Sequence, residues 1–379
     1  MSHDAVAARH AVDDNPKRML ALDGGGIKGI LTLGYLKRIE TLLRLRYNKD
    51  DLVLSDYYDF IGGTSTGAII AASLSLGNDV DTIIELYEQL GKSIFETSWR
   101  RGILLPRFKT NALEAALKDH IGDISFADEA IKTGLMIILK RWDTGSLWVL
   151  HNIRGNKYYE KYTKGYLLRQ VVRGSTAAPS YFKPEVMDVT PTEEAAFVDG
   201  GVTSHNNPAW QLFMLATING YGLNWSTGAD NLSITSIGTG FREKKSQAND
   251  WKNRVSLTNA LTSLQLMMDD ADSLNQIMLQ WLSKSPTNKV IDSEIGDLAG
   301  ECLTPEPLFH YVRYDIELSP MSIRKAWPDV GTDLPNDLHK MEKAANIELL
   351  KTIGEKAAAF QLTDQAFGEH FPKSFDIGQ

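Results

Sequence analysis

The chain has 379 residues, of which 43% are hydrophobic and 23% charged, a balance that excludes disordered, collagenous and coiled-coil proteins and predicts a folded core. Its 40 Lys and Arg residues face 48 Asp and Glu residues, and the net charge of −8 argues against general nucleic-acid binding. The single cysteine, Cys302, excludes an internal disulfide framework and a zinc site of several cysteines, so a reducing compartment is expected.

The N-terminal segment, residues 1–17, is polar, and its aspartates break any signal-peptide pattern, so we expect a flexible tail there. The most apolar stretch, residues 61–76, contains several hydroxyl side chains and falls short of the roughly 18 apolar residues of a spanning helix. We therefore expect a cytoplasmic protein, either soluble or peripheral to a membrane.

Strand and helix signals alternate over residues 18–240, which predicts one layered α/β domain with a mostly parallel sheet. The apolar run at residues 19–22 stops at a glycine cluster, and a helical pattern follows over residues 31–47. A second strand, turn and helix follow over residues 58–74. Further strands are expected at residues 135–140, 147–151, 197–199 and 232–237, and further helices at residues 111–120, 167–174 and 208–219.

Beyond Gly240 the pattern changes. A charged stretch over residues 242–254 precedes an amphipathic helix predicted for residues 257–282. One strand at residues 311–316 and a terminal helix at residues 336–360 follow. We place a boundary here and expect residues 241–379 to form a mainly helical region packed on the catalytic domain.

The glycine cluster is Asp23-Gly24-Gly25-Gly26-Ile27-Lys28-Gly29. Bare backbone N–H groups at the start of a helix can hold an anion or a developing oxyanion. The spacing also satisfies the dinucleotide pattern G-x-G-x-x-G, but no acidic ribose ligand follows some 20 residues on. A P-loop is excluded, because Lys28 precedes the last glycine; a tight turn without a ligand remains open.

The second motif, Gly63-Thr64-Ser65-Thr66-Gly67, is a G-x-S-x-G sequence between a predicted strand and a helix of small residues. In a nucleophile elbow, the flanking glycines permit a strained turn that exposes the serine hydroxyl. Ser65 is therefore the candidate nucleophile. The alternative is a hydroxyl cluster that caps a buried helix.

A serine nucleophile needs a base. His151 and His205 are the only histidines near predicted strand ends, and we interpret both as surface or loop residues. Asp199, in contrast, ends a short apolar strand and precedes Gly200 and Gly201, which allow close backbone approach beside its carboxylate. A turn or helix-capping role for Asp199 is the alternative.

In combination, the three motifs resemble the patatin-like phospholipase family. The likeness covers residues 19–240 and includes Ser-Thr-Ala-Ala-Pro-Ser-Tyr-Phe at residues 175–182 and Asn-Asn-Pro at residues 206–208. It implies a three-layer α/β/α fold and a Ser–Asp dyad without histidine, in which Ser65 is the nucleophile and Asp199 the base. One departure is Lys28, where the family usually has arginine; lysine keeps the charge but lacks the planar fork needed for a bidentate contact.

The resemblance implies a lipid acyl hydrolase of the phospholipase A type. Its oxyanion hole would comprise Gly24, Gly25, Gly26 and Lys28, with no cofactor and no metal. The acidic run at residues 269–272 lacks the glycine and terminal glutamate of a calcium loop. Asp199 is expected beside apolar neighbours such as Phe197, because shielding from water makes a carboxylate more basic.

A lipid enzyme must meet a membrane, and residues 99–109 interleave basic, aromatic and aliphatic side chains as interfacial segments do. A buried connection with a basic rim is the alternative. The helix expected at residues 257–282 is interpreted first as core, with a lid or a contact in a homo-oligomer as alternatives.

Three functions remain in competition. The first is a phospholipase; the second, a general carboxylesterase or thioesterase; the third, a nucleotide-binding signalling module that uses residues 24–29 for phosphate. Some bacterial proteins that resemble the family are antiviral effectors activated by cyclic nucleotides and carry extra helical segments, so a cyclic nucleotide is a candidate activator by analogy.

Overall fold

The computed structural model describes residues 3–91, 110–179, 181–242, 256–330 and 334–377. Nine strands in this described part form one sheet: β1 (Lys17–Leu22), β2 (Phe60–Thr64), β3 (Gly134–Arg141), β4 (Leu147–His151), β5 (Glu185–Thr190), β6 (Glu193–Asp199), β7 (Leu232–Ile237), β8 (Ser283–Lys284) and β9 (Phe309–Tyr314).

The sheet is mixed and mostly parallel, as predicted. Its order is β5-β6-β3-β2-β1-β7-β9-β8, with β4 paired to β3 outside this path. The run from β3 through β8 is parallel at every pairing, whereas β4 and β6 are antiparallel to β3. The carboxyl ends of β1, β2, β7 and β9 therefore meet at one edge, and β6 runs back towards β3 so that Asp199 pairs with Leu139.

The helices of the described part follow in chain order: α1 (His3–His10), α2 (Gly29–Tyr47), α3 (Leu54–Tyr57), α4 (Thr66–Ser75), α5 (Val80–Leu90), α6 (Thr110–Ile121), α7 (Lys157–Lys161), α8 (Leu168–Ser175), α9 (Ala209–Thr217), α10 (Ser256–Trp281), α11 (Pro320–Ala326), α12 (Ile347–Gln361) and α13 (Asp364–His370).

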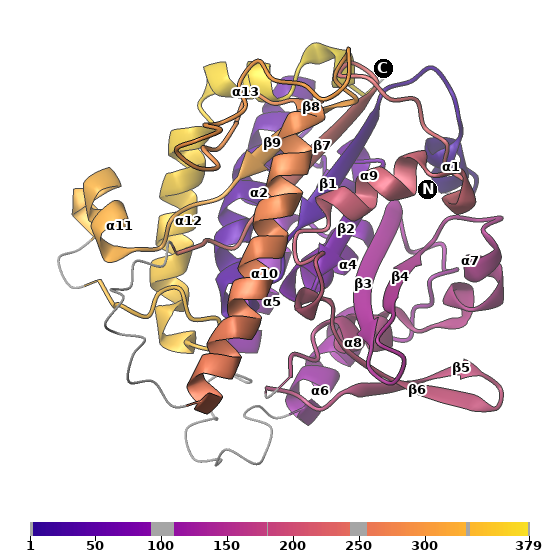
Figure 1. The fold of residues 1–379 in the computed structure, drawn as a ribbon. Coiled ribbons are helices and arrows are strands. Elements are labelled where there is room, and N and C mark those ends of the chain that lie inside the picture. Colours follow the sequence, from indigo (N-terminus) through magenta and orange to yellow (C-terminus); the bar gives the residue numbers. More distant parts are fainter. Residues whose placement is uncertain (1–2, 92–109, 180, 243–255, 331–333, 378–379) are drawn as a thin grey trace.

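These helices cover both faces of the sheet. Strand β1 shows why, because Leu20 and Leu22 join the apolar cluster of α2, α4, α5, α8 and α12, while Met19 and Ala21 join the cluster of α9 and the end of α10. Helix α10 crosses the front of the sheet and α2 and α12 lie behind it (Figure 1). A central strand that is buried on both faces has a nearly continuous run of apolar residues. The three-layer α/β/α fold predicted from the sequence is confirmed.

The N-terminal residues differ from the expected flexible tail. Helix α1 is docked by Arg9, whose guanidinium donates to the carbonyl oxygens of Ser55, Tyr58 (3.2 Å) and Asp56 (3.3 Å). The His10 ring stacks on Phe60, with 5.3 Å between ring centroids. The guanidinium satisfies carbonyl groups at the end of α3 that the helix itself leaves without donors.

The region beyond Gly240 also differs from expectation, because it is less purely helical. Strand β9 pairs in parallel with β7, and β8 with β9, so the sheet continues across the boundary placed at Gly240. The terminal helix begins at Ile347, about a dozen residues later than predicted; the preceding chain lies against the glycine loop, where the Met341 carbonyl accepts a hydrogen bond from the Ile27 amide (2.9 Å). The division into two domains stays a prediction.

Candidate active site

Ser65 sits in a strained turn between β2 and α4. Its backbone has φ 54° and ψ −122°, a conformation that costs a residue with a side chain on the order of 1–3 kcal/mol. The two flanking glycines make the turn possible. A Cβ atom on Gly63 would lie 2.2 Å from the Gly67 carbonyl oxygen, and one on Gly67 would lie 2.1 Å from that of Leu22. The turn leaves the Ser65 side chain partly exposed.

The strained backbone of Ser65 is held by Ser175, the last residue of α8. The Ser65 amide donates to the Ser175 hydroxyl (2.9 Å), which in turn donates to the Ile138 carbonyl oxygen on β3 (2.7 Å). Ser175 is buried. Ser175 belongs to the stretch of residues 175–182 that resembles the family, but no local pattern indicates its role, because its partners lie 37 and 110 residues away in the chain.

The structure brings Ser65 and Asp199 together. The Ser65 hydroxyl donates to Asp199 Oδ2 at 2.6 Å, and the other carboxylate oxygen accepts from the Gly201 amide at 2.7 Å. Asp199 is 4% exposed, and burial raises its pKa from 3.8 to about 6 against the opposing effect of both hydrogen bonds. Such a carboxylate is a stronger base than an ordinary aspartate and is still ionised at neutral pH.

No histidine in the described part bonds to Ser65 or Asp199. His205 lies in the loop after Gly201, as interpreted from the sequence, although its side chain is buried. His151 is a buried residue at the end of β4 rather than a surface or loop residue, and its Nδ1 atom accepts from the Ile153 amide. Burial lowers the pKa of both histidines, that of His151 to about 4. The arrangement is a serine–aspartate pair.

The glycine loop lies directly beside this pair. A Cβ atom on Gly24 would be 3.0 Å from Ser65 Cβ and 2.5 Å from the side-chain oxygen of Asn206. The Gly24 amide is already engaged, since it donates to the Asn206 carbonyl oxygen (3.2 Å). The amides of Gly25 and Gly26 donate no hydrogen bond to any described residue. The loop's capacity to hold an oxyanion therefore rests on Gly25 and Gly26.

Lys28 is not brought to the serine. Its ammonium donates to the carbonyl oxygen of Gly240, beyond the end of β7, at 2.9 Å. Burial lowers the pKa of Lys28. Within the described part, this side chain ties the start of α2 to the loop after β7 and touches neither Ser65 nor Asp199.

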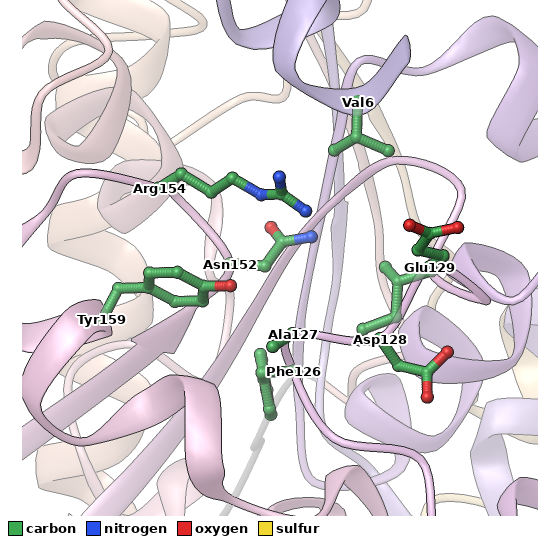
Figure 2. A pocket seen from close by; sticks show the side chains of 9 residues that line it. Val6, Phe126, Ala127, Asp128, Glu129, Asn152, Arg154 and Tyr159 are labelled. Carbon is green, nitrogen blue, oxygen red and sulfur yellow. The ribbon is translucent and has the colours of Figure 1, made fainter. Parts of the chain in front are cut away.

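Two hollows in the described part lie away from this site. One, of about 10 Å³, is lined by Val6, Phe126, Asp128, Asn152 and Tyr159 among others (Figure 2), and the other, of about 210 Å³, shares Val6 and Asn152 with it. Both are smaller than the roughly 300 Å³ at which ligand pockets begin. Neither is lined by the serine, the aspartate or the glycine loop.

Comparisons with known proteins identify the family of this chain. A family model described as patatin-like phospholipase matches residues 20–213, about half of the chain. The chain belongs to the patatin-like phospholipase family. The match takes in Ser65, Asp199 and the glycine loop, and it ends before β7.

Two curated relatives of this chain come from Escherichia coli. A cUMP-AMP-activated phospholipase is 32% identical over 213 residues, which cover 54% of this chain and 59% of that protein. A cGAMP-activated phospholipase from strain TW11681 is 27% identical over 237 residues, with coverages of 60% and 64%. The chain thus spans less than two thirds of the length of these relatives.

Among solved structures, human GIVD cytosolic phospholipase A2 in complex with methyl γ-linolenyl fluorophosphonate matches with a TM-score of 0.44 and 11% identity, covering 98% of this chain and 62% of that one. No helix of the described residues is both long and apolar enough to cross a bilayer. The predicted interfacial segment at residues 99–109 and most of the charged stretch at residues 242–254 fall outside the described residues.

Proposed function

We propose that this patatin-like protein is a lipid acyl hydrolase that cleaves fatty-acyl esters of membrane phospholipids, with Ser65 as nucleophile and Asp199 as general base. The observation that carries the proposal is the 2.6 Å hydrogen bond from the Ser65 hydroxyl to Asp199. Ser65 makes it from a strained elbow, beside two amides that have no partner among the described residues. A nucleophile in hydrogen-bond contact with its base is the geometry that acyl transfer requires.

The first half-reaction follows from these positions. Ser65 Oγ attacks the ester carbonyl carbon while Asp199 Oδ2 takes the hydroxyl proton. The amides of Gly25 and Gly26 hold the negative oxygen of the tetrahedral intermediate, and each such donor is worth about 3–4 kcal/mol. When the intermediate collapses, the bond from carbon to the lysolipid oxygen breaks, and Asp199 returns the proton to that oxygen.

The second half-reaction uses the same groups in reverse roles. Asp199 takes a proton from water, whose oxygen attacks the acyl-serine carbonyl. Collapse of the second intermediate frees the fatty acid and returns the proton to Ser65. A positioned base contributes about 10²- to 10⁴-fold. The raised pKa of Asp199, about 6, lets one carboxylate both accept and release this proton near neutral pH.

Access to lipid needs a local surface, because the net charge of −8 disfavours attraction of the whole molecule to anionic membranes. The candidate is the basic and aromatic segment at residues 99–109, which would make the protein peripheral to the membrane and cytoplasmic. The names of the two bacterial relatives support activation by a cyclic nucleotide, which we propose here as well.

The test compares wild type and Ser65→Ala on phospholipid vesicles and on short soluble esters, with and without cyclic dinucleotides, and identifies the products by mass spectrometry. Release of fatty acid and lysolipid by wild type, lost in Ser65→Ala, is the expected result. Turnover of short esters alone would favour a carboxylesterase or thioesterase. Nucleotide binding without any hydrolysis would favour a signalling module, and equal activity of the two proteins would refute the nucleophile.

A further inference from the structure

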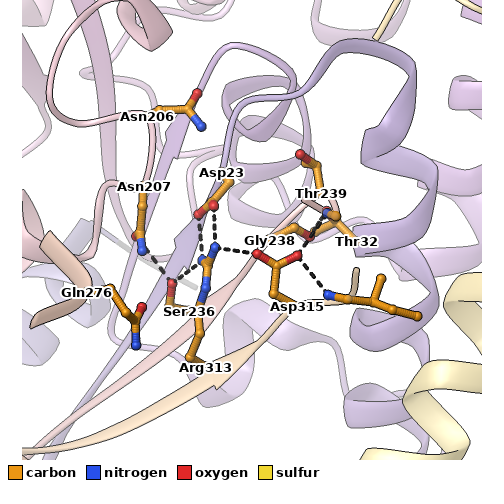
Figure 3. Close-up of polar contacts among 12 residues, drawn as sticks. Asp23, Thr32, Asn206, Asn207, Ser236, Gly238, Thr239, Gln276, Arg313 and Asp315 are labelled. Atoms are coloured by element: carbon orange, nitrogen blue, oxygen red, sulfur yellow. Dashed lines mark hydrogen bonds and ion pairs between the residues drawn. The ribbon is translucent and has the colours of Figure 1, made fainter. Parts of the chain in front are cut away.

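A buried ion pair anchors the start of the glycine loop. Asp23, between the last residue of β1 and Gly24, receives two hydrogen bonds from Arg313 on β9, from Nη1 to Oδ1 (2.8 Å) and from Nη2 to Oδ2 (2.6 Å). Figure 3 shows the two side chains facing each other with both contacts drawn. The side chains are only 10% and 5% exposed. A parallel two-point contact of this kind fixes orientation as well as distance.

The same guanidinium also reaches two further groups. Its Nη1 donates to the Ser236 hydroxyl on β7 (2.7 Å), and its Nη2 donates to Asp315 just after β9 (2.9 Å) (Figure 3). Asp315 in turn accepts from the Gly240 amide at 2.9 Å. One arginine thus joins the carboxyl ends of β1, β7 and β9, the edge of the sheet where the glycine loop begins.

The loop's first peptide units are held against the end of β7. The Asp23 amide donates to the Ile237 carbonyl oxygen (3.2 Å), and the Gly24 carbonyl oxygen accepts from the Thr239 hydroxyl (3.1 Å) and from the Asn206 side chain (3.4 Å). These contacts fix Asp23 and Gly24 and leave the amides of Gly25 and Gly26 without partners in the described part. The Gly25 and Gly26 amides lie between these contacts and the hydrogen bond from the Ile27 amide to the Met341 carbonyl oxygen, so the way Asp23 is held is one of the constraints on their positions.

The charges around Asp23 make its ionised form depend on Arg313. Asp315 and, on α10, Asp272 act on Asp23 as like charges, and Arg313 opposes them. Burial raises the pKa of Asp23 to about 7 even with the guanidinium in place. Although burial also opposes the charge of Arg313, the carboxylates of Asp23 and Asp315 raise its pKa well above the usual value. Without the arginine, the Asp23 carboxylate would be left buried beside two others, which is strongly unfavourable.

We propose that Arg313 is a positioning residue of the oxyanion loop. It holds Asp23 in place and so sets the positions of the Gly25 and Gly26 amides relative to Ser65. Arg313 lies 100 residues beyond the end of the family match at residue 213, and the inference gives the C-terminal region a part in the reaction. It deepens the proposed function and, as a statement about catalysis, rests on it.

The chain offers a matched control at the other end of β1. Arg18 makes the same two-point contact with Asp59, at 2.9 Å for both bonds, and the two side chains are 12% and 5% exposed. This pair lies at the amino ends of β1 and β2, the edge opposite to Ser65. Removing Arg18 therefore removes a buried ion pair of the same kind without touching the glycine loop.

The test measures kcat, KM and thermal unfolding for Arg313→Gln, Arg313→Lys and Arg18→Gln. We expect Arg313→Gln to lower kcat about 10²-fold with KM changed less than about threefold, because misplaced oxyanion donors act on the transition state. Arg313→Lys should recover part of the loss, since the ammonium can still pair with Asp23. Arg18→Gln should be destabilised to a similar degree and keep kcat within about threefold. Equal losses of kcat in both glutamine variants would overturn the proposal.

A double variant separates positioning from folding. Asp23→Asn combined with Arg313→Gln removes the carboxylate that accepts two of the arginine's hydrogen bonds, while Asp315 keeps its hydrogen bond from the Gly240 amide. Stability should therefore recover in part while kcat stays low. Recovery of kcat together with stability would show that the arginine serves folding alone. The double variant and Arg313→Lys remain informative even where Arg313→Gln folds poorly. In the double variant Asp23 no longer carries a charge, and in Arg313→Lys a cation still faces it.

A final readout does not depend on activity. With ¹⁵N-glycine labelling, the amide resonances of residues 24–26 should shift in Arg313→Gln and stay in place in Arg18→Gln. If wild type hydrolyses no ester, the proposed function fails while this measurement still decides whether Arg313 sets the loop. Unchanged glycine resonances in a folded Arg313→Gln protein would refute the positioning role directly.

Discussion

Strand β1 carries a buried arginine–aspartate pair at each end, and the surroundings of the two pairs differ sharply. At the amino end, Asp59 accepts two hydrogen bonds from the Arg18 guanidinium and one from the Arg18 amide (2.8 Å). The Arg9 guanidinium donates to nearby carbonyl oxygens. At the carboxyl end, the Asp23 pair stands next to Ser65 at φ 54°, Gly26 at φ 60° and two amides without partners in the described part.

The difference shows where this fold concentrates strain. At the amino end both oxygens of the Asp59 carboxylate accept hydrogen bonds from Arg18, an arrangement that serves stability. At the carboxyl end lie a strained serine, a buried carboxylate with its pKa raised to about 6, and two amides to which the described part of the chain offers no acceptor. Unfavourable local features persist only where the rest of the structure enforces them, and they mark functional sites. Changes at the two ends should therefore affect different quantities.

The largest contrast is expected between Asp199→Asn and Asp59→Asn. The first removes the general base and should lower kcat by about 10²- to 10⁴-fold. The second breaks the Arg18 pair and should lower stability, by about 3–5 kcal/mol, while kcat changes less than about threefold. Initial rates of fatty-acid release and urea denaturation report the two effects. A fully active Asp199→Asn protein would remove the aspartate from the mechanism.

Substitution of Gly24 should come next in size. A methyl group there would meet Asn206 Oδ1 at 2.5 Å and Ser65 Cβ at 3.0 Å, so the loop must move away from the serine. We expect Gly24→Ala to lower kcat about 10²-fold, because small displacements of catalytic groups are costly.

Gly165→Ala is the matched control for that loss, since nothing lies within 4 Å of its added methyl group. It should leave kcat unchanged. If both alanine variants behaved like wild type, the close approach of Gly24 to Ser65 would have no bearing on the reaction.

The pH dependence should be smaller and of known sign. Asp199 must be ionised to take the Ser65 proton, and burial raises its pKa to about 6. The rate kcat/KM should therefore be constant above about pH 7 and fall roughly tenfold per unit below pH 6. Circular dichroism at each pH checks that the protein remains folded. A flat rate profile down to pH 4.5 would contradict the raised pKa.

The smallest effect concerns stability. Because the pKa of Asp199 is raised from 3.8 to about 6 on folding, the native state binds the proton more tightly than the unfolded chain does. Its ionisation destabilises the fold progressively as pH rises from about 4 to about 6, and the penalty persists above that. Asp199→Asn should thus be about 1–3 kcal/mol more stable than wild type at pH 8 and nearly equal at pH 4. An equal gain at both pH values would point to another cause.

Much of the site could be predicted because its chemistry is local in sequence. Where a strand ends at a glycine cluster or at G-x-S-x-G, the turn and the helix that follow are predicted by residues close in the sequence. Strands β4 and β7 match the predicted residues 147–151 and 232–237. The nearness of Ser65 and Asp199 was inferred from a family resemblance. The sequence alone could not place them together, because the two residues are 134 apart in the chain and β6 reaches β3 by an antiparallel pairing that no local pattern indicates.

The features that the sequence does not predict are set by contacts between residues far apart in the chain. Asp23 and Arg313 are 290 residues apart, and no local pattern links them. The apolar run at β9 indicated a strand, but its place beside β7, across the boundary put at Gly240, is set by packing. Residues 336–346 have helical periodicity and nevertheless form a loop that ends in a short 3₁₀ turn. Within the loop, the Met341 carbonyl oxygen accepts a hydrogen bond from the Ile27 amide. Tertiary contacts override local preference there.

The central claim is that Ser65 is made nucleophilic by Asp199 without a histidine. The most direct measurement is the rate of covalent labelling by a fluorophosphonate, with the modified residue located by peptide mass spectrometry, in wild type and Asp199→Asn. The account predicts a single adduct on Ser65 that forms at least about 10²-fold more slowly in the variant. Labelling of another residue, or an equal rate in the two proteins, would contradict it.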